Sequence, residues 1–576
     1  MVFDVQPGSS IGLPLADEDL TVGKSFAYCV ERFGPRRALV FEGRSWTFDE
    51  LAADVDQCAR ALIAAGVGKG TRVGVVLGTR PEFAALAYAI AMVGGVCVLI
   101  STFSTDEELD WIVRHSDTAL LVTHSAVRSR PVARDFVSRH PAIVECERGM
   151  ISDLALPYLR RVVVVANDDS ALDPRLETWD TFLSAGNGID PGLVPARNAE
   201  VAPGDDAILL YTSGSTSIPK AVLHAHRAPT IKGFRMADCI AIGEDDRVWS
   251  SFPVFWTAGW VTAIAAPLLV GACAVLQEFY EPHEALALIE RERVTCVRQI
   301  IHDEMRLVAA HAEHPSDLSS VDVGVVTEAL RSLTSVPAGI TDLCGWGMTE
   351  TFTNATMLPL DAPYELRLAT MGRPVPGDRI RIRDRETGAE MAANELGEIT
   401  VAGMTLMRGY YKADPALPTD AAGFLPTNDA GFMTPDGFLV FAGRLDRLIK
   451  TAGVNVSPVE IEERLLDWGR LGTCAVVGVP HPTLGSAVVL CAARRSADDV
   501  SVDEIRSYLQ SNLSTYKVPK RVIFYDEAEF PLTVNSKIHI PVLREQLIAR
   551  LLEDDIDADW KEQLRSEFGS GYRRSR

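Results

Sequence analysis

Residues 207–220 read AILLYTSGSTSIPK, an apolar run that leads straight into a polar loop. Hydroxyl side chains and a glycine directly after a buried strand can wrap the oxygens of a phosphate, and Lys220 adds a positive charge. The loop lacks the GxxxxGK[ST] spacing of a Walker P-loop, so it is not a nucleotide site of that class. Taken alone, the stretch is explained equally well as an ordinary Ser/Thr-rich surface loop.

The chain before this loop alternates short apolar runs with amphipathic stretches. Residues 37–48 predict a hairpin, and a helix follows for which Asp49 is a suitable cap. Residues 73–77 and 96–100 predict strands on either side of a helix that begins at Pro81. Strand, helix and strand in this rhythm predict an α/β fold with mostly parallel sheets covered by helices.

The periodicity changes after the loop. Residues 377–404 alternate with period two, as in RIRIRD and GEITVAG, which predicts a small barrel-like β part over about residues 370–442. A small α+β unit follows it. We therefore expect an N-terminal acyl- and nucleotide-binding domain over residues 1–445 and a mobile C-terminal domain over 446–552. Residues 553–576 are charged and low in apolar content, which predicts a disordered tail.

Composition limits the function. The chain has 576 residues, with 56 basic and 78 acidic side chains and a net charge of −22. An acidic surface repels phosphate backbones, so nucleic acid is not expected as a partner. The ten cysteines are scattered singly without zinc-site spacing, which is typical of buried thiols in a reducing compartment. The N-terminus lacks the basic start and apolar core of a secretory signal, so we expect a cytoplasmic protein.

One uncharged segment, residues 250–277, is long enough to span a bilayer. Pro253, Gly259, Pro267 and Gly271 break it into short pieces. A buried strand–helix–strand passage is therefore favoured over the alternative of a membrane span.

Further motifs stand in a fixed order along the chain. They are FPVFWTAG at 252–259, GWGMTE at 345–350, MGRPVPG at 371–377, LGEITVAG at 396–403, MRGYY at 407–411, TND at 427–429, GRLDRLIKTAGVNVSPVEIE at 443–462, YKVPK at 516–520 and PLTVNSKI at 531–538. Together with the loop at 211–220, the series resembles the adenylate-forming superfamily, in particular its acyl-CoA synthetase branch. The resemblance runs from about residue 20 to 545. It implies an acid–thiol ligase that makes an acyl-AMP from ATP and passes the acyl group to coenzyme A.

Acyl activation brings two anions together, because a carboxylate attacks the α-phosphate of ATP, and such a site needs positive charge. The resemblance implies that Mg²⁺ and one lysine supply it. On this basis Glu350 is a metal ligand and Thr216 a second one. Thr349 contacts phosphate, and Lys537 bridges the carboxylate and the phosphate. Lys537, Thr349 and Glu350 are the candidate catalytic residues.

The resemblance assigns the nucleotide to the loop and to later motifs. Asp429 would bind the ribose diol, since two acceptor oxygens suit two vicinal hydroxyls. The guanidinium of Arg444 would contact ribose or phosphate. Trp346 stands where tyrosine usually stacks on adenine, although a core tryptophan is the alternative. The candidate nucleotide-binding residues are Thr212, Ser213, Gly214, Ser215, Thr216, Lys220, Trp346, Gly347, Asp429 and Arg444.

The resemblance also implies a C-terminal domain that moves between two positions. Asp446 matches the hinge, with a turn acid as the alternative, and the region around Gly453 would face the thiol tunnel. Trp256 and Gly259 match the place where the acyl pocket meets this tunnel. The segment lacks the aspartate by which amino-acid-activating relatives hold an ammonium group, so an apolar acid is expected. A buried core explains the same apolar residues equally well.

Departures from the family pattern cluster at the ATP site and the lysine. Ser217, Asn428 and Ser536 replace glycines, Trp346 replaces tyrosine, and the region 325–330 is shortened. Three readings follow: a complete acyl-CoA ligase, a ligase that only forms the thioester from acyl-adenylate supplied by a partner enzyme, and a non-catalytic binder of nucleotide and acyl groups. The acid, the choice between CoA and a carrier-protein thiol, and the oligomeric state stay open.

Overall fold

The structure is a computed structural model that describes residues 10–166, 173–212, 219–324, 328–336, 345–358, 362–413, 417–445, 447–451, 454–495, 500–532 and 538–568. The chain divides into two compact units. Unit 1 consists of Met1–Ile380, Val401–Leu425 and Gly437–Leu439, and unit 2 consists of Arg381–Thr400, Pro426–Asp436 and Val440–Arg576.

The apolar run before the polar loop is strand β8, Asp206–Thr212, in the larger sheet of unit 1. The described strands of this sheet follow the order β20-β9-β8-β4-β3-β5-β6-β7. Neighbours from β8 to β7 are parallel, whereas β9 and β20 pair in antiparallel fashion. The other strands are β3 (Arg72–Val76), β4 (Val96–Leu99), β5 (Leu120–His124), β6 (Arg161–Val165), β7 (Glu177–Thr178), β9 (Lys220–Ala225) and β20 (Gly409–Tyr410).

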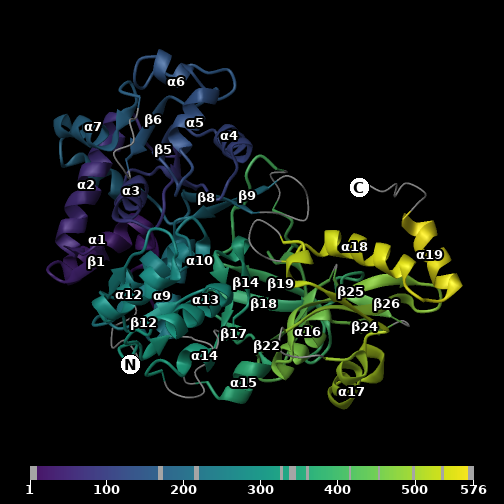
Figure 1. The fold of residues 1–576 in the computed structure, drawn as a ribbon. Coiled ribbons are helices and arrows are strands. Elements are labelled where there is room, and N and C mark those ends of the chain that lie inside the picture. Colours follow the sequence, from purple (N-terminus) through teal and green to yellow (C-terminus); the bar gives the residue numbers. More distant parts are fainter. Residues whose placement is uncertain are drawn as a thin grey trace. The chain divides into compact units, whose positions relative to one another are not determined.

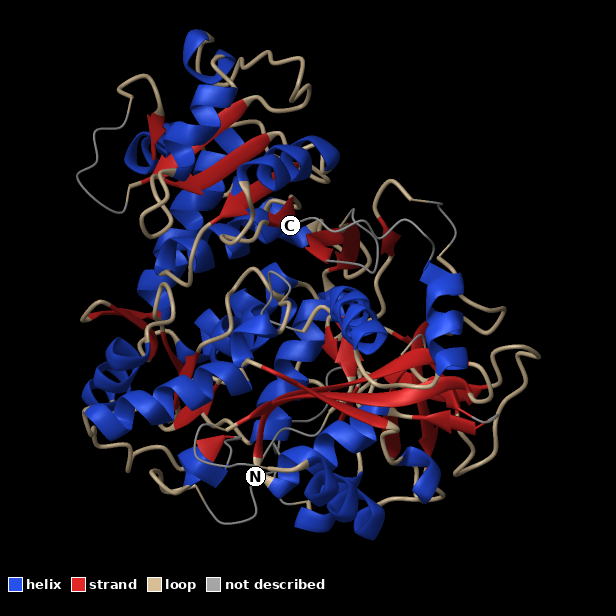
Figure 2. Ribbon diagram, turned by 45° about the vertical axis from the view of Figure 1, so that its right-hand side comes forward, coloured by secondary structure: helices blue, strands red, loops and turns tan. Residues whose placement is uncertain are grey.

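Two sets of helices cover this sheet, as its continuously apolar central strands require (Figures 1 and 2). The first set packs in one apolar cluster with strand residues such as Val98 and Leu121. It comprises α4 (Asp106–His115), α5 (Val132–Arg139) and α6 (Ala142–Glu145). The second set packs together as a separate layer. It comprises α2 (Phe48–Ala64), α3 (Pro81–Met92), α7 (Trp179–Ala185) and α8 (Leu193–Ala199).

The smaller sheet of unit 1 has its described strands in the order β13-β12-β10-β11-β1-β2. The strands are parallel except for β1 and β2, which form the predicted hairpin. They are β1 (Arg37–Phe41), β2 (Arg44–Thr47), β10 (Arg247–Ser250), β11 (Cys273–Val275), β12 (Cys296–Arg298) and β13 (Val323–Gly324). Trp249 and Val297 lie in one apolar cluster with α12 (Pro282–Glu292) and α13 (Ile301–Glu313).

Residues 250–277 form the predicted strand–helix–strand passage. The helix begins as α10 (Thr257–Gly259), continues as a π-helical turn, η3 (Trp260–Ala265), and ends as α11 (Ala266–Leu269). Pro267 has no N–H to donate to the preceding turn, so regular α-helical bonding cannot continue through it. This helix packs against α9 (Arg227–Ile240) and α1 (Val22–Phe33). Within the described residues, none of the helices combines the length and the hydropathy that crossing a bilayer requires.

Short hairpins follow the smaller sheet and lead to the β-rich part. The antiparallel pairs are β14 (Gly347–Met348) with β15 (Thr353–Asn354), and β16 (Thr356–Met357) with β17 (Arg373–Pro374). The period-two pattern then forms strands in the order β18-β19-β21-β22, which are Asp378–Arg383, Gly397–Gly403, Leu425–Met433 and Leu439–Arg444. Short helices complete unit 1: η1 (Asp17–Asp19), η2 (Gly186–Gly188), α14 (Glu328–Arg331), η4 (Thr349–Thr351) and α15 (Tyr364–Ala369).

Unit 2 contains a sheet in which β24, β23, β26 and β25 are successive neighbours and β27 pairs with β26. Leu465 and Ile505 lie in the apolar cluster on one face, and Leu547 and Trp560 lie in the cluster on the other. The strands are β23 (Ile449–Thr451), β24 (Val454–Val456), β25 (Leu471–His481), β26 (Gly485–Arg494) and β27 (Arg521–Tyr525). The helices are α16 (Pro458–Trp468), α17 (Val502–Asn512), η5 (Thr515–Lys517), η6 (Glu527–Glu529), α18 (Ile540–Glu553) and α19 (Ala558–Phe568).

Two local predictions are wrong. Thr47, not Asp49, caps α2, because its hydroxyl accepts from the Glu50 N–H at 3.1 Å while the Glu50 carboxylate accepts from the Thr47 N–H at 2.8 Å. Within the predicted disordered tail, residues Ala558–Phe568 form α19, because Trp560 and Leu564 fall four apart on one helix face and are buried. The predicted domain boundary at Asp446 stays a prediction, since that residue lies outside the described residues.

Packing of α19 can be tested by the variant Trp560→Ala. The indole is 1% exposed, donates from Nε1 to the Pro480 carbonyl at 2.7 Å, and lies 4.7 Å from the His481 ring. We expect a loss of about 3–5 kcal/mol in the free energy of unfolding, measured by urea titration. Leu466→Ala, at a position that is 71% exposed, is the matched control and should cost less than about 0.5 kcal/mol. Equal losses in the two variants would show that α19 does not dock.

Candidate functional site

The predicted phosphate loop is held between two paired strands. Thr212 at the end of β8 lies opposite Lys220 at the start of β9. The loop therefore leaves and re-enters at the carboxyl end of β8, the edge of a parallel sheet where ligands commonly bind. The Lys220 ammonium lies 5.1 Å from the centroid of the Tyr410 ring, so a cation and an aromatic ring stand beside the loop.

The Glu350 carboxylate is buried and held in place. It is 9% exposed, and its Oε1 accepts a hydrogen bond from the Tyr410 hydroxyl at 2.7 Å. Its backbone carbonyl accepts from the Met407 N–H, also at 2.7 Å. Tyr410 lies on β20 and is the register partner of Val222 on β9. The carboxylate is thus fixed relative to the strand that leaves the phosphate loop.

His224 on β9 holds the neighbouring residue. Its Nε2 lies 2.7 Å from the Thr349 carbonyl, and its ring meets Phe352 edge-on at 5.0 Å. Burial lowers the pKa of His224 to about 4, and the hydrogen bond to Thr349 opposes this only in part. The imidazole is therefore neutral near pH 7, and a carbonyl partner requires that Nε2 carry the proton. Nδ1 is buried without a hydrogen-bond partner among the described residues.

The turn that carries Thr349 and Glu350 is tight. Phe352 and Thr353 have φ values of 57° and 125°, which non-glycine residues adopt at a cost. A Cβ on Gly347 would lie 2.0 Å from the Thr353 carbonyl oxygen, so only glycine fits there. The hydrogen bonds from His224 and Tyr410 help to stabilise this strained turn. The turn and these two bonds together hold the Glu350 carboxylate in one orientation.

A second group of predicted residues lies in unit 2. The Arg444 guanidinium forms an ion pair with the buried Asp429 carboxylate at 2.9 Å. Asn428, which replaces a glycine of the family pattern, has a φ of 61°. Asparagine tolerates this left-handed conformation, so the backbone geometry expected of glycine is retained.

Aromatic side chains gather at the carboxyl ends of β4 and β10. Phe103, which is 47% exposed, lies 5.5 Å from the Phe255 ring and 6.4 Å from the Trp256 ring. Gly259 is the last residue of α10, and a Cβ there would lie 1.9 Å from the Pro253 carbonyl oxygen. Phe255 is buried, whereas Trp256 is partly exposed. The segment thus serves as core on one side and presents an aromatic surface on the other.

The remaining predicted residues divide into two groups. Trp346 is only 5% exposed, which favours the alternative of a core tryptophan over adenine stacking. The other predicted residues, which lie outside the described residues, are Ser213, Gly214, Ser215, Thr216, Ser217, Asp446, Gly453, Ser536 and Lys537. Sequence reasoning missed His224, Tyr410 and Phe103. Tyr410 stands in the quoted MRGYY motif, but no local signal marks the other two.

The residues present fit a Mg²⁺ ion that is held with nucleotide phosphates. The described part of the chain contains no cluster of three or more His, Cys, Asp or Glu side chains arranged to hold a metal. Mg²⁺ is commonly bound by one or two carboxylates together with phosphates and water. Glu350 supplies one carboxylate, and its second oxygen makes no hydrogen bond within the described residues.

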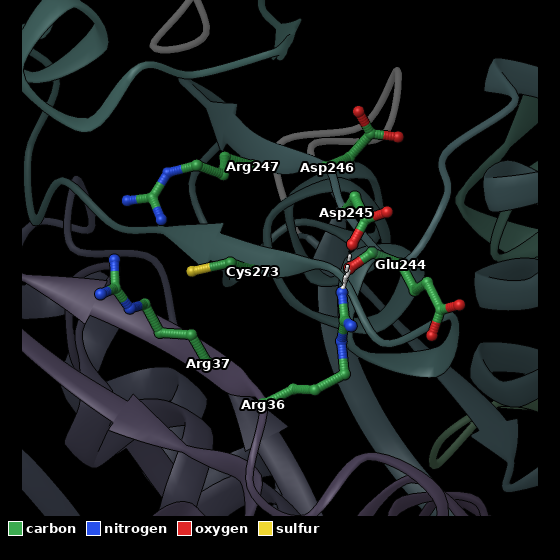
Figure 3. A pocket seen from close by; sticks show the side chains of 7 residues that line it. All are labelled: Arg36, Arg37, Glu244, Asp245, Asp246, Arg247 and Cys273. Atoms are coloured by element: carbon green, nitrogen blue, oxygen red, sulfur yellow. Dashed lines mark hydrogen bonds and ion pairs between the residues drawn. The ribbon is translucent and has the colours of Figure 1, made fainter.

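A cavity of about 320 Å³ lies elsewhere in unit 1 (Figure 3). Arg37, Arg247 and Cys273 stand at the amino ends of β1, β10 and β11, the edge opposite to the aromatic cluster. Arg247 forms an ion pair with Glu292, and Arg36 forms one with Asp245. These two arginines of the cavity wall are therefore neutralised by carboxylates of the protein itself. Burial raises the pKa of Cys273 to about 11, which removes it as a nucleophile near pH 7.

Comparison with known proteins identifies the class. A family model described as AMP-binding enzyme matches residues 26–411, and one described as AMP-binding enzyme C-terminal domain matches residues 460–537. The chain belongs to the AMP-binding enzyme family, in the acyl-CoA ligase branch of the adenylate-forming superfamily. It is an AMP-forming acid–CoA ligase, and enzymes of this family use ATP and coenzyme A.

Named relatives agree over nearly the whole length. The acyl-CoA ligase SID4 of Ajellomyces capsulatus is 27% identical over 554 residues, which cover 92% of this chain and 91% of that protein. The sulfoacetate–CoA ligase of Cupriavidus necator is 30% identical over 509 residues, which cover 86% of this chain and 91% of that protein. The crystal structure of the anthranilate CoA ligase AuaEII with anthranoyl-AMP has a TM-score of 0.75 at 23% sequence identity. The match covers 92% of this chain and 98% of that one. This last likeness establishes the fold.

His224 provides a test of the Glu350 turn. His224→Leu leaves the Thr349 carbonyl without its donor, which costs on the order of 1–3 kcal/mol. We expect kcat/KM of acyl-adenylate formation to fall roughly ten- to a hundredfold. His224→Gln keeps an amide donor and should restore most of the rate. Thioester formation from supplied acyl-AMP is the control and should change little. Equal loss in both assays, without rescue by glutamine, would make His224 a folding residue only.

Proposed function

We propose that this chain converts a carboxylic acid into its CoA thioester in two steps, through an acyl-adenylate that it makes itself from ATP. The observation that carries the proposal is the fixed carboxylate of Glu350, whose partner Tyr410 lies beside Lys220 at the end of the phosphate loop. A side chain that only filled space would not need hydrogen bonds to its carboxylate, its backbone and its neighbour. These contacts suit a group that must bind one ligand in one geometry.

In the first step, a carboxylate oxygen of the acid attacks the α-phosphorus of ATP, and pyrophosphate leaves. Glu350 would hold a Mg²⁺ ion, which neutralises phosphate charge when bound. Tyr410 orients the Glu350 carboxylate, and His224 fixes the adjoining Thr349. Lys220 and the loop 213–218 would contact phosphate, and Lys537 would bridge the two anions. Asp429 and Arg444 would bind the ribose.

In the second step, the thiol of coenzyme A attacks the acyl carbon and AMP leaves. The apolar part of the acyl group would lie against the aromatic residues Phe103 and Trp256. The C-terminal domain would turn about Asp446 between the steps and bring the region of Gly453 to the thiol.

The complete reaction is preferred over thioester formation alone and over a non-catalytic binder. The alternatives depend on the departures at the ATP site. Of these, Asn428 keeps the left-handed backbone of the glycine it replaces, so it does not disturb the neighbouring Asp429. The ion pair of Asp429 with Arg444 and the hydrogen bond that holds the Glu350 carboxylate support this preference.

The experiment compares two routes to the same thioester: acid with ATP and CoA, and synthetic acyl-AMP with CoA. Wild-type protein should use both and release pyrophosphate in the first. Lys537→Ala should slow the first route by roughly a hundredfold or more, because one preorganised donor to the developing charge is lost. The second route should survive. A wild-type protein active only with acyl-AMP would establish the thioester-only alternative, and activity in neither route would establish the binder.

Asp446→Pro tests the proposed movement. Proline fixes φ near about −65° and removes a donor, so a hinge at this position would be held in one state. We expect one half-reaction to fall steeply while the other stays near the wild-type rate, each measured separately. Asp446→Ala, which leaves the backbone free, is the control. Equal rates of both half-reactions in the proline variant would exclude a hinge there.

A further inference from the structure

A buried arginine that has no partner among the described residues lies next to the proposed acyl site. Arg298, the last residue of β12, is 7% exposed. Its Nε is buried without a hydrogen-bond partner, and its guanidinium forms no ion pair and no side-chain hydrogen bond within the described residues. The side-chain nitrogen and oxygen of the next residue, Gln299, are likewise buried and unpaired.

The register of the sheet shows where Arg298 points. Arg298 is the parallel register partner of Ser250 on β10, so the two side chains project from the same face. The Ser250 hydroxyl lies 2.9 Å from that of Thr262 in η3. Arg298 therefore faces the layer of η3 and α9, and its charge acts on Cys239 of α9. Ser251 bonds to the Arg298 carbonyl at 2.9 Å and opens the segment that leads to Trp256.

An unpaired guanidinium in such a place is unfavourable. A buried charge loses its hydration, and proteins normally offset this loss with a counter-ion and hydrogen bonds. The carboxylate of Glu304 favours the charged form of Arg298, yet no ion pair joins these two described side chains. Burial lowers the pKa of Arg298, and the charges of neighbouring side chains offset this only in part. A ligand oxyanion would supply the missing partner.

We propose that Arg298 binds a second oxyanion at the far end of the acid that the enzyme activates. The inference rests on the proposed acyl-CoA ligase function and names the substrate class: a carboxylic acid that carries a distal carboxylate or sulfonate. A guanidinium presents parallel N–H donors to either group. The expectation of an apolar acid is thereby revised. The middle of the acid would contact the aromatic residues, and its distal end would be charged.

The experiment measures kcat/KM of thioester formation for three acid series of increasing chain length: unbranched fatty acids, α,ω-dicarboxylic acids and ω-sulfonated acids. Wild-type protein should prefer one charged series by at least tenfold at some chain length. Arg298→Leu should lose at least a hundredfold on that series and keep or gain activity on the fatty acids. Arg298→Lys should lie between them, because it keeps the charge but not the fork. A preference for carboxylates over sulfonates, or the reverse, identifies the anion.

Arg247→Leu is the matched control. Arg247 stands at the amino end of β10 in the same sheet and pairs with Glu292. Its loss should lower stability but leave the ratio between charged and fatty acids unchanged. Calorimetric titration of each protein with the dicarboxylic acids supplies a readout that needs no turnover.

The outcomes separate this inference from the proposed function. A wild-type preference for fatty acids at every length, unchanged in Arg298→Leu, would overturn the role of Arg298 while the ligase function stands. If no acid is converted, tighter binding of a dicarboxylic acid to wild type than to Arg298→Leu supports the anion site. Equal binding to the two proteins overturns it.

Discussion

Two adjacent residues, Thr349 and Glu350, are held by side chains of two paired strands. His224 on β9 binds the carbonyl of one, and Tyr410 on β20 binds the carboxylate of the other. Both strands belong to the sheet whose strand β8 ends at the phosphate loop. The acidic turn is therefore fixed to the sheet whose residues Thr212 and Lys220 flank the phosphate loop. If the turn moved relative to the sheet, a ligand shared between loop and carboxylate could not be positioned.

The two sheets of unit 1 also bring distant residues together at their carboxyl edges. Parallel strands place all of their following loops at the same edge, so residues distant in sequence meet there. Phe103 follows β4 of the larger sheet and Trp256 follows β10 of the smaller one, and their rings are in contact. The cavity of Figure 3, at the amino edge of the smaller sheet, contains charges that neutralise one another.

Two buried cations in unit 1 differ in the partners that surround them. Lys232 on α9 is 2% exposed, and its ammonium contacts the Asp378 carboxylate at 2.5 Å and the Asn354 carbonyl at 2.6 Å. Breaking such a pair commonly costs about 3–5 kcal/mol, so it ties α9 to β15 and β18. Arg298 has a similar burial but no such partner within the described residues. An anionic group of a ligand would therefore stabilise the guanidinium of Arg298.

Contiguous patterns in the chain predicted the α/β class, the hairpin at β1 and β2, the strand β8, and the start of α3 at Pro81. Such features depend on neighbours in sequence: apolar runs, alternation with period two, and a proline at a helix start. The family also follows from short motifs in order. Local patterns failed where a few apolar residues decide the outcome, as in α19, where two buried side chains outweigh a charged composition. They also failed at the α2 cap, where two hydrogen-bonding side chains compete within three residues.

The support of the site came only from the tertiary structure. His224 and Thr349 are 125 residues apart, and Tyr410 and Glu350 are 60 apart. Nothing in either segment marks the other, because these contacts exist only once β9 and β20 are paired. The same holds for Arg298. An arginine in a sequence predicts a solvated charge. Its burial, with no partner among the residues that the structure describes, becomes visible only when the helices that cover it are in place. A sequence motif gives the type of side chain at a position and hence its possible chemistry. The orientation of that side chain and the partners it finds arise from packing between distant segments.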